Sequence, residues 1–100
     1  MTGEQMSTVI DKAVEALAKR LPDGFSPVAK FVIEGEGSII ADAQGVRAGD
    51  GPAEVTLSAD LDTFRGLFEG RVNPTVAFMQ GRLKVDGPMM LAMKLGSALS

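Results

Sequence analysis

The segment from Met89 to Leu99 constrains the fold of this chain more than any other stretch. It reads MMLAMKLGSAL, with Lys94 and Ser97 as its strongly polar side chains. Its length suits a helix, but a helix that is apolar on nearly every side is not stable with a wide face in water. Either the rest of the chain covers this helix, or something that binds to the chain does so.

An amphipathic helix is predicted over residues 4–21. Apolar residues recur there at helical spacing, opposite a face of acidic and basic side chains. Thr2 followed by Gln5 resembles a capping box, and the Pro-Asp-Gly sequence at residues 22–24 ends the helix. The apolar stripe consists of Met6, Val9, Ile10, Ala13, Val14, Leu17 and Leu21.

Five short segments alternate apolar and polar residues, which is the pattern of strands. Residues 28–34 and 38–43 are separated by a Gly-Glu-Gly turn and predict a hairpin. Residues 46–48 predict a short third strand, residues 54–58 a fourth and residues 82–86 a fifth. The side chains expected in the core of the sheet are Phe31, Ile33, Ile39, Val55, Leu57, Leu83 and Val85.

Two short helices are predicted between the fourth and fifth strands. Asp60 is a natural N-cap for the first, which ends near Gly70. Asn73 before Pro74 provides the cap and the first residue of the second, and Pro88 opens the final helix. The apolar side chains on the two short helices are Leu61, Phe64, Leu67, Phe68, Val76, Phe78 and Met79.

This order of elements predicts an α+β fold in a single domain over residues 1–100. Strands that run together and have one apolar face predict a five-stranded, mostly antiparallel mixed sheet covered on one face by helices. The connection from the fourth strand through two helices to the fifth is long enough for a crossover, so at least one parallel strand pair is expected. A chain of this length buries roughly two-thirds of its surface, enough for one core and a single pocket.

Residues 73–96, NPTVAFMQGRLKVDGPMMLAMKLG, resemble the carboxyl-terminal signature of the sterol carrier protein type 2 family. The preceding DGPAEVTLSADLDTFRGLFEGRVNP is similar too, and KFVIEGEGSI more weakly. The resemblance implies an SCP2-like fold with an apolar tunnel between helices and sheet that holds a fatty acid, a fatty acyl-CoA, a sterol or an isoprenoid-like lipid. The chain ends Ser-Ala-Leu-Ser rather than in a peroxisomal address, so a peroxisomal location is not assumed. It also ends soon after the final helix, so we expect a wide tunnel mouth.

The methionines of the final helix have two interpretations. Spacing alone favours simple core filling, whereas the resemblance favours ligand contact for Met90 and Met93 and, less strongly, for Met89. Methionine is unbranched and polarizable, so it suits a surface that fits apolar chains of varying shape. For the helix after Asp60, core packing and pocket contact stay equally open. The predicted lipid-binding residues are Phe64, Leu67, Phe68, Phe78, Met79, Met89, Met90 and Met93.

The composition argues against catalysis and metal binding. The chain has no histidine and no cysteine, which excludes Ser-His and Cys-His nucleophiles and thiolate metal sites. Asp60 and Asp62 form a bare Asp-x-Asp that lacks the other ligands of a calcium loop. The GEGS sequence at residues 35–38 fits a hairpin turn better than a phosphate loop. We therefore expect a protein that is not an enzyme and needs no cofactor.

Charge and hydropathy narrow the partners and the location. The net charge is −3 and the ten basic residues are scattered, which argues against nucleic-acid binding. The apolar runs are shorter than the ~20 residues that span a bilayer, and no secretory signal opens the chain, so a cytoplasmic location is expected. Some basic residues of the second half could meet a carboxylate or phosphate, although solvated surface charge is the expected role of each. They are Arg65, Arg71, Arg82, Lys84 and Lys94.

The leading hypothesis is the non-catalytic binding and carriage of an apolar lipid. A second hypothesis makes the apolar side of residues 89–99 a protein interface, so that the chain is a homodimer or a docking module. A third is an accessory protein that presents a lipid intermediate to enzymes. A transient contact with a membrane surface is also left open.

Overall fold

The computed structural model of the chain describes residues 2–99, with side chains from residue 9 onward. Met6 and the capping box predicted at Thr2 and Gln5 therefore lie outside the described side chains. The predicted elements are confirmed, with ends that differ by one or two residues. In chain order they are α1 (Thr2–Arg20), β1 (Ala29–Ile33), β2 (Gly37–Asp42), β3 (Gly45–Ala48), β4 (Val55–Ala59), α2 (Leu61–Phe68), α3 (Pro74–Met79), β5 (Lys84–Asp86) and α4 (Met89–Leu99).

The five strands form one mixed sheet in the order β3-β2-β1-β4-β5. The parallel pair is β1–β4, in which Phe31 lies opposite Leu57. The remaining neighbours are antiparallel, including β4–β5. The sequence indicated the β4–β5 connection as the crossover, and that placement is wrong. The chain instead crosses over between β1 and β4, because β2 and β3 fold outward from β1 and leave its other edge free for β4.

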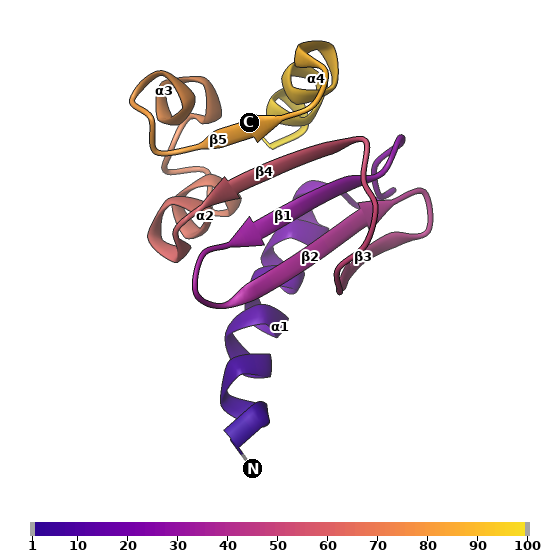
Figure 1. The fold of residues 1–100 in the computed structure, drawn as a ribbon, viewed down its shortest axis with the longest axis vertical. Helices are drawn as coiled ribbons and strands as arrows, with labels where there is room; N and C mark the ends of the chain where they lie inside the picture. Colours follow the sequence, from indigo (N-terminus) through magenta and orange to yellow (C-terminus); the bar gives the residue numbers. More distant parts are fainter. Residues whose placement is uncertain (1, 100) are drawn as a thin grey trace.

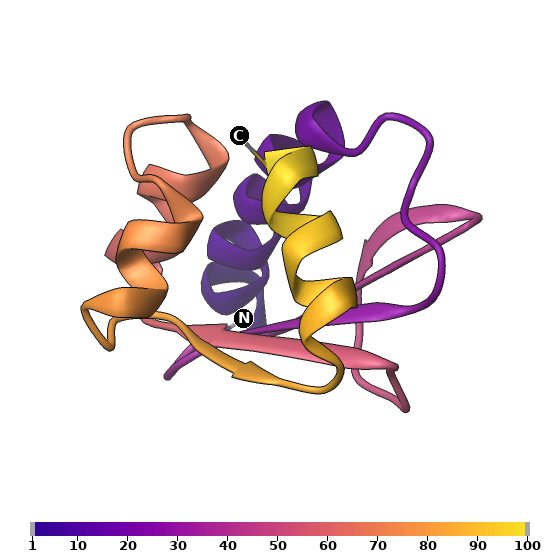
Figure 2. The same ribbon diagram turned by 90° about the horizontal axis from the view of Figure 1, so that it is seen from above.

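The four helices lie on one side of this sheet (Figure 2). Alternate residues of β1 and β4 are buried against them, so these central strands supply the floor of the core. The predicted sheet core is confirmed with one difference, since Val85 is only partly buried. The fully or nearly fully buried members are Phe31, Ile33, Ile39, Val55, Leu57 and Leu83.

The opposite face of the sheet is crossed by the loop between β3 and β4 (Figure 1). Lys30 Nζ on β1 lies 3.0 Å from Asp50 Oδ1 in this loop. The hydrogen bond from Lys30 lowers the pKa of the Asp50 carboxyl below its ordinary value of 3.8. The helices, and any ligand site among them, therefore belong to the other face.

Helix α2 is fixed by an aromatic cluster and by both of its ends. Phe64 and Phe68 each meet Phe31 edge-on, with ring centroids 6.0 Å apart. The Asp60 side chain caps the helix by accepting a hydrogen bond of 2.8 Å from the Thr63 backbone N–H. At the other end Gly70 adopts φ 80°, the left-handed conformation that closes a helix with a Schellman motif. Both predicted helix ends are thus confirmed.

Helix α4 docks through its leucines and leaves its methionines outside. Leu95 and Leu99 are 0% and 1% exposed, whereas Met90 is 82% and Met93 67% exposed. The Lys94 side chain reaches the loop between α1 and β1, where its Nζ donates to the Ser26 carbonyl oxygen at 2.9 Å. The protein's own core therefore covers only one side of this apolar helix.

We predict that the two sides of α4 differ sharply in their contribution to stability. Leu95→Ala should lower the free energy of unfolding by about 2–5 kcal/mol, because it opens a cavity under the helix. Met90→Ala should change it by less than about 0.5 kcal/mol, because that side chain contacts mostly solvent. Urea unfolding followed by circular dichroism measures both values. Similar losses in the two variants would contradict this docking of the helix.

Candidate functional site

An open groove is lined by residues of α3 and α4 and of the neighbouring strands β4 and β5. Figure 2 shows how α3 and α4 stand next to each other above these strands. The volume of the groove is about 460 Å³, within the range of roughly 300–1,000 Å³ that ligand pockets in proteins span. The residues that line it are Leu57, Asn73, Pro74, Thr75, Phe78, Met79, Leu83, Val85, Met89, Ala92, Met93, Gly96 and Ser97.

The lining of this groove is mostly apolar. Its polar side chains are those of Asn73, Thr75 and Ser97, and no charged side chain of the described residues lines it. The Asn73 side chain is already engaged, since its Oδ1 accepts hydrogen bonds from the backbone N–H groups of Thr75 at 2.8 Å and Val76 at 3.3 Å. The groove can therefore hold a partner mainly by removing apolar surface from water.

The shape of α4 explains why the groove is there. At roughly 100° per residue, the leucines that dock the helix occupy one sector of its surface and the groove-facing residues occupy the next. Two of those, Ala92 and Gly96, are small and lie one turn apart. A Cβ at Gly96 would come within 3.7 Å of Pro74 Cβ, so the two helices approach closely at this end of the groove. The groove-facing residues of α4 are Met89, Ala92, Met93, Gly96 and Ser97.

Helix α3 forms the opposite wall and is anchored by few groups. Asn73 caps it, Pro74 is its first residue, and Ala77 is its fully buried contact with the core. Gly81, at φ 76°, closes it with a second Schellman motif, in which the Arg82 N–H donates to the Ala77 carbonyl oxygen at 2.9 Å. This anchoring leaves the side chains of Phe78 and Met79 at the groove.

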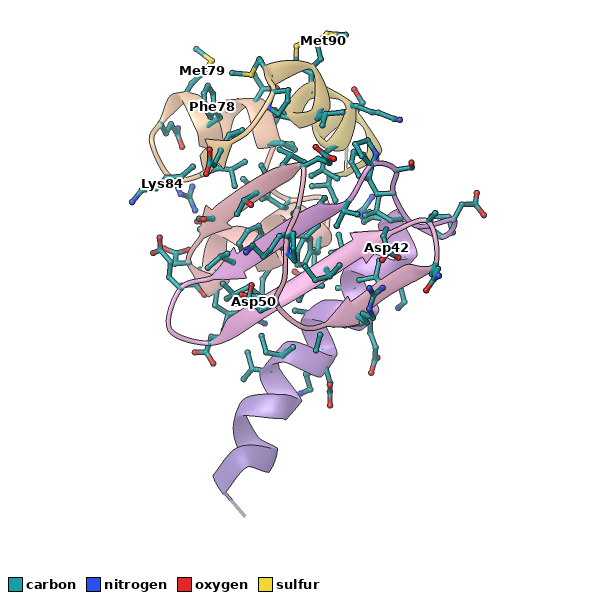
Figure 3. The ribbon with its side chains drawn as sticks, turned by 45° about the vertical axis from the view of Figure 1, so that its right-hand side comes forward. Asp42, Asp50, Phe78, Met79, Lys84 and Met90 are labelled. Atoms are coloured by element: carbon teal, nitrogen blue, oxygen red, sulfur yellow. The ribbon has the colours of Figure 1, made fainter. Side chains whose placement is uncertain are left out.

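The structure brings together four of the eight predicted site residues. Phe78 and Met79 of α3 line one wall of the groove, and Met89 and Met93 of α4 line the other. Met90 lies next to these residues in sequence but points outward at the end of the molecule (Figure 3).

The three predicted site residues of α2 lie elsewhere. Phe64 and Leu67 are fully buried in the core. Phe68, 4% exposed, borders a second, smaller pocket between α1 and α2.

Sequence reasoning missed Ala92 and Gly96 as site residues. Small side chains draw no attention in a scan for large apolar groups. Their spacing of four residues on the face next to the docking leucines was the available signal, because it marks a strip of the helix that fills little space.

The second pocket has a volume of about 310 Å³. Unlike the groove, it includes charged side chains of both signs, from Lys12, Arg65 and Glu69. An apolar chain in this pocket would lie against groups that need water or a counter-charge. The groove between α3 and α4 is the better candidate site for an apolar ligand.

The basic residues that the sequence offered for a ligand head group all lie off the groove lining. Arg71 Nη2 pairs with Glu69 Oε1 at 2.8 Å, and Arg82 Nη2 donates to the buried Thr63 hydroxyl at 3.3 Å. The Thr63 backbone N–H lowers the pKa of the Asp60 carboxyl below its ordinary value of 3.8. These charges support α2 and its flanks rather than a bound head group.

The part of the chain that the structure describes has neither a cluster of metal-binding side chains nor a membrane-spanning helix. Among the side chains that the structure describes, from residue 9 onward, no three acidic groups gather closely enough to hold a metal ion. None of the helices there combines the length and apolar content needed to cross a bilayer.

Comparison with known proteins identifies a family that matches nearly the whole chain. The sequence model of the SCP-2 sterol transfer family matches residues 8–100. Hydroxysteroid dehydrogenase-like protein 2 of Xenopus laevis is 35% identical over 98 residues, which cover 90% of this chain and 23% of that protein. The human protein of the same name is 49% identical over 43 residues, or 43% of this chain and 10% of that one. The chain thus spans at most about a quarter of these relatives.

Two solved structures share the fold over most of its length. Sterol carrier protein 2 of Aedes aegypti, solved in complex with the C16 fatty acid palmitate, superposes with a TM-score of 0.72 at 25% identity and covers 90% of this chain and 93% of that one. The apo form of sterol carrier protein 2 from Yarrowia lipolytica gives a TM-score of 0.61 at 28% identity, with 87% and 73% coverage.

We predict that the α3 wall depends on its cap. Asn73→Ala should lower the free energy of unfolding by about 1 kcal/mol, because the first N–H groups of the helix lose their acceptor. Asn73→Ser, which restores an acceptor oxygen, should recover most of that loss. Chemical denaturation of the two variants side by side tests this. An alanine variant as stable as the parent would show that α3 needs no cap.

Proposed function

The chain belongs to the SCP-2 sterol transfer family, and we propose that it binds and carries an apolar lipid chain in the groove between α3 and α4, without catalysing a reaction on it. The observation that carries this proposal is the lining of the groove, which is apolar except for three neutral polar side chains. The Aedes aegypti relative, solved with a bound fatty acid, supports the same class of ligand.

The proposed ligand is a long acyl chain, as a fatty acid or its coenzyme A ester, or a sterol or isoprenoid-like body of similar width. Burying one methylene contributes about 0.8 kcal/mol, so a dozen methylenes outweigh one exposed ion pair, which contributes at most about 1 kcal/mol. The length and bulk of the apolar part should therefore decide selectivity. The head group would remain at the mouth of the groove, in water.

The proposed contacts are the side chains that form the two walls. Phe78 and Met79 would meet the ligand from α3, and Met89 and Met93 from α4. Three of these four are methionines, whose unbranched thioether chains adapt to ligands of different shape. An enclosed tunnel, and ligand contacts by Met90 and by the three predicted residues of α2, stay predictions from the sequence.

The proposal extends to the location of the protein and to its partners. We place it in the cytoplasm as a single lipid-binding domain over residues 1–100. Presentation of a lipid intermediate to enzymes is compatible with the same groove, since an open wall releases a ligand as readily as it admits one. The homodimer alternative draws on the exposed side of α4, and sedimentation at increasing protein concentration tests it.

We predict that filling the groove removes ligand binding while the fold stays intact. Ala92→Phe places a ring between the two walls and should weaken the binding of a fluorescent fatty acid by at least about tenfold, equivalent to roughly 1.4 kcal/mol. Val76→Phe is the matched control, because Val76 is exposed and does not line the groove. Fluorescence titration measures both variants. Equal binding by the two would place the ligand elsewhere.

We also predict that chain length, and not the carboxylate, sets affinity. Each methylene added to a saturated fatty acid should lower Kd about fourfold until the groove is full. The methyl ester should bind about as well as the free acid, because the described lining has no cation to meet a carboxylate. Displacement of the fluorescent fatty acid measures both series. A strong preference for the free acid would indicate a charged anchor and contradict this arrangement.

A further inference from the structure

Among the residues from 9 onward, two glycines lie inside helices. They are Gly66 in α2 and Gly96 in α4. Glycine is, after proline, the least favourable residue in a helix, because it loses the most backbone freedom on folding. Neither glycine has the positive φ that favours this residue elsewhere in the chain. Each of them therefore needs another explanation in the structure.

The explanation for Gly66 is steric. A Cβ added at this position would clash with the side chain of Val72, which follows the helix. The Val72 backbone N–H donates to the Gly66 carbonyl oxygen at 3.0 Å, so the two backbones are held together at this point. The fold itself requires a glycine here.

The surroundings of Gly96 are different. For a Cβ added there, the nearest described atom outside α4 would be Pro74 Cβ, at 3.7 Å. This distance is an ordinary van der Waals contact rather than a clash. An alanine would therefore fit at residue 96, and it would also favour the helix. The feature that distinguishes Gly96 is its place in the lining of the groove, at the end where α3 and α4 approach each other.

We propose that Gly96 is a specificity-determining residue, whose missing side chain sets how much of an apolar ligand the groove accepts at its Pro74 end. The proposal rests on the proposed function, since it concerns the same groove and the same class of ligand. Departures from local sequence rules are expected at functional positions. Here the departure leaves space for ligand where an alanine would fill it.

The opposite side of this end is held in place. Pro74 is buried and is the first residue of α3, and its ring fixes φ. Asn73 immediately before it caps the helix, with its Oδ1 accepting from the Thr75 N–H at 2.8 Å. A side chain added at residue 96 would therefore take space from the ligand and would not push the α3 wall aside.

The size of the effect follows from the size of a methyl group. A methyl group at residue 96 takes the space of about one methylene of the ligand, and one buried methylene changes Kd about fourfold. Ligands that are too short to reach the Pro74 end lose nothing. The effect of the side chain should therefore depend on the length of the ligand, which a general weakening of the site would not.

Gly96→Ala tests the proposal because it should change stability and capacity in opposite directions. Urea unfolding should give a higher midpoint than for the parent, since alanine favours the helix. Saturated fatty acids of increasing length are used to displace the fluorescent fatty acid. Short acids should keep the parental Kd, whereas acids that fill the groove of the parent should bind about fourfold more weakly. Ala92→Gly, one turn earlier on α4, should lower both the midpoint and the Kd of the longest acids.

Gly51→Ala is the matched control, the same substitution in the loop between β3 and β4 on the other face of the sheet (Figure 1). Gly51 has no positive φ, and a Cβ there would meet no described atom within 4 Å beyond its chain neighbours. This variant should raise the midpoint by restricting the unfolded chain, and it should leave every Kd unchanged.

Three results would overturn the proposal. The first is a parental Kd at every length for Gly96→Ala, and the second is the same weakening at every length. The third is a lower urea midpoint for Gly96→Ala, because the fold itself would then require the glycine. A parent protein that binds no fatty acid of any length would instead refute the proposed function.

Discussion

The burial of α4 is the constraint on which the rest of the molecule depends. This helix is apolar around most of its circumference, and the sheet covers only the side that carries Leu95 and Leu99. The core could extend further around the helix only if α3 packed along the whole strip of α4 that carries Ala92 and Gly96. The two helices approach closely where Pro74 meets Gly96. The groove is the space left along the rest of that side.

The same constraint sets the chemistry of the groove. Two basic side chains of this half of the chain have other partners, since Lys94 donates to the Ser26 carbonyl and Arg82 to the Thr63 hydroxyl, and Lys84 lies outside the groove lining. In the proposed function, an apolar chain would be bound more tightly the longer it is, and its end would have no fixed partner. A groove with this lining favours breadth of ligand over selectivity for one head group.

Much of this fold could be predicted from the sequence because its local signals agree with its tertiary structure. The caps at Asp60 and Asn73 and the closing glycine of α2 mark helix ends by local hydrogen bonding alone, and the structure confirms them. Alternation in the strands predicted the buried face for the same reason. The position of the parallel pair was missed, because pairing β1 with β4 depends on which edge of β1 remains open after the hairpin forms. No local pattern in the sequence records that choice.

The site was harder to predict than the fold, and Met89 and Met90 show why. Neighbours in a helix point roughly 100° apart, so one of them turns into the groove and the other away from it. Which one does so depends on where α3 lies, and α3 is held by Asn73, Ala77 and Gly81, which are distant from the methionines in sequence. Composition could therefore indicate that α4 has surplus apolar surface. Assigning Met89 and Met93 to the groove and Met90 to the outward side required the position of the neighbouring helix.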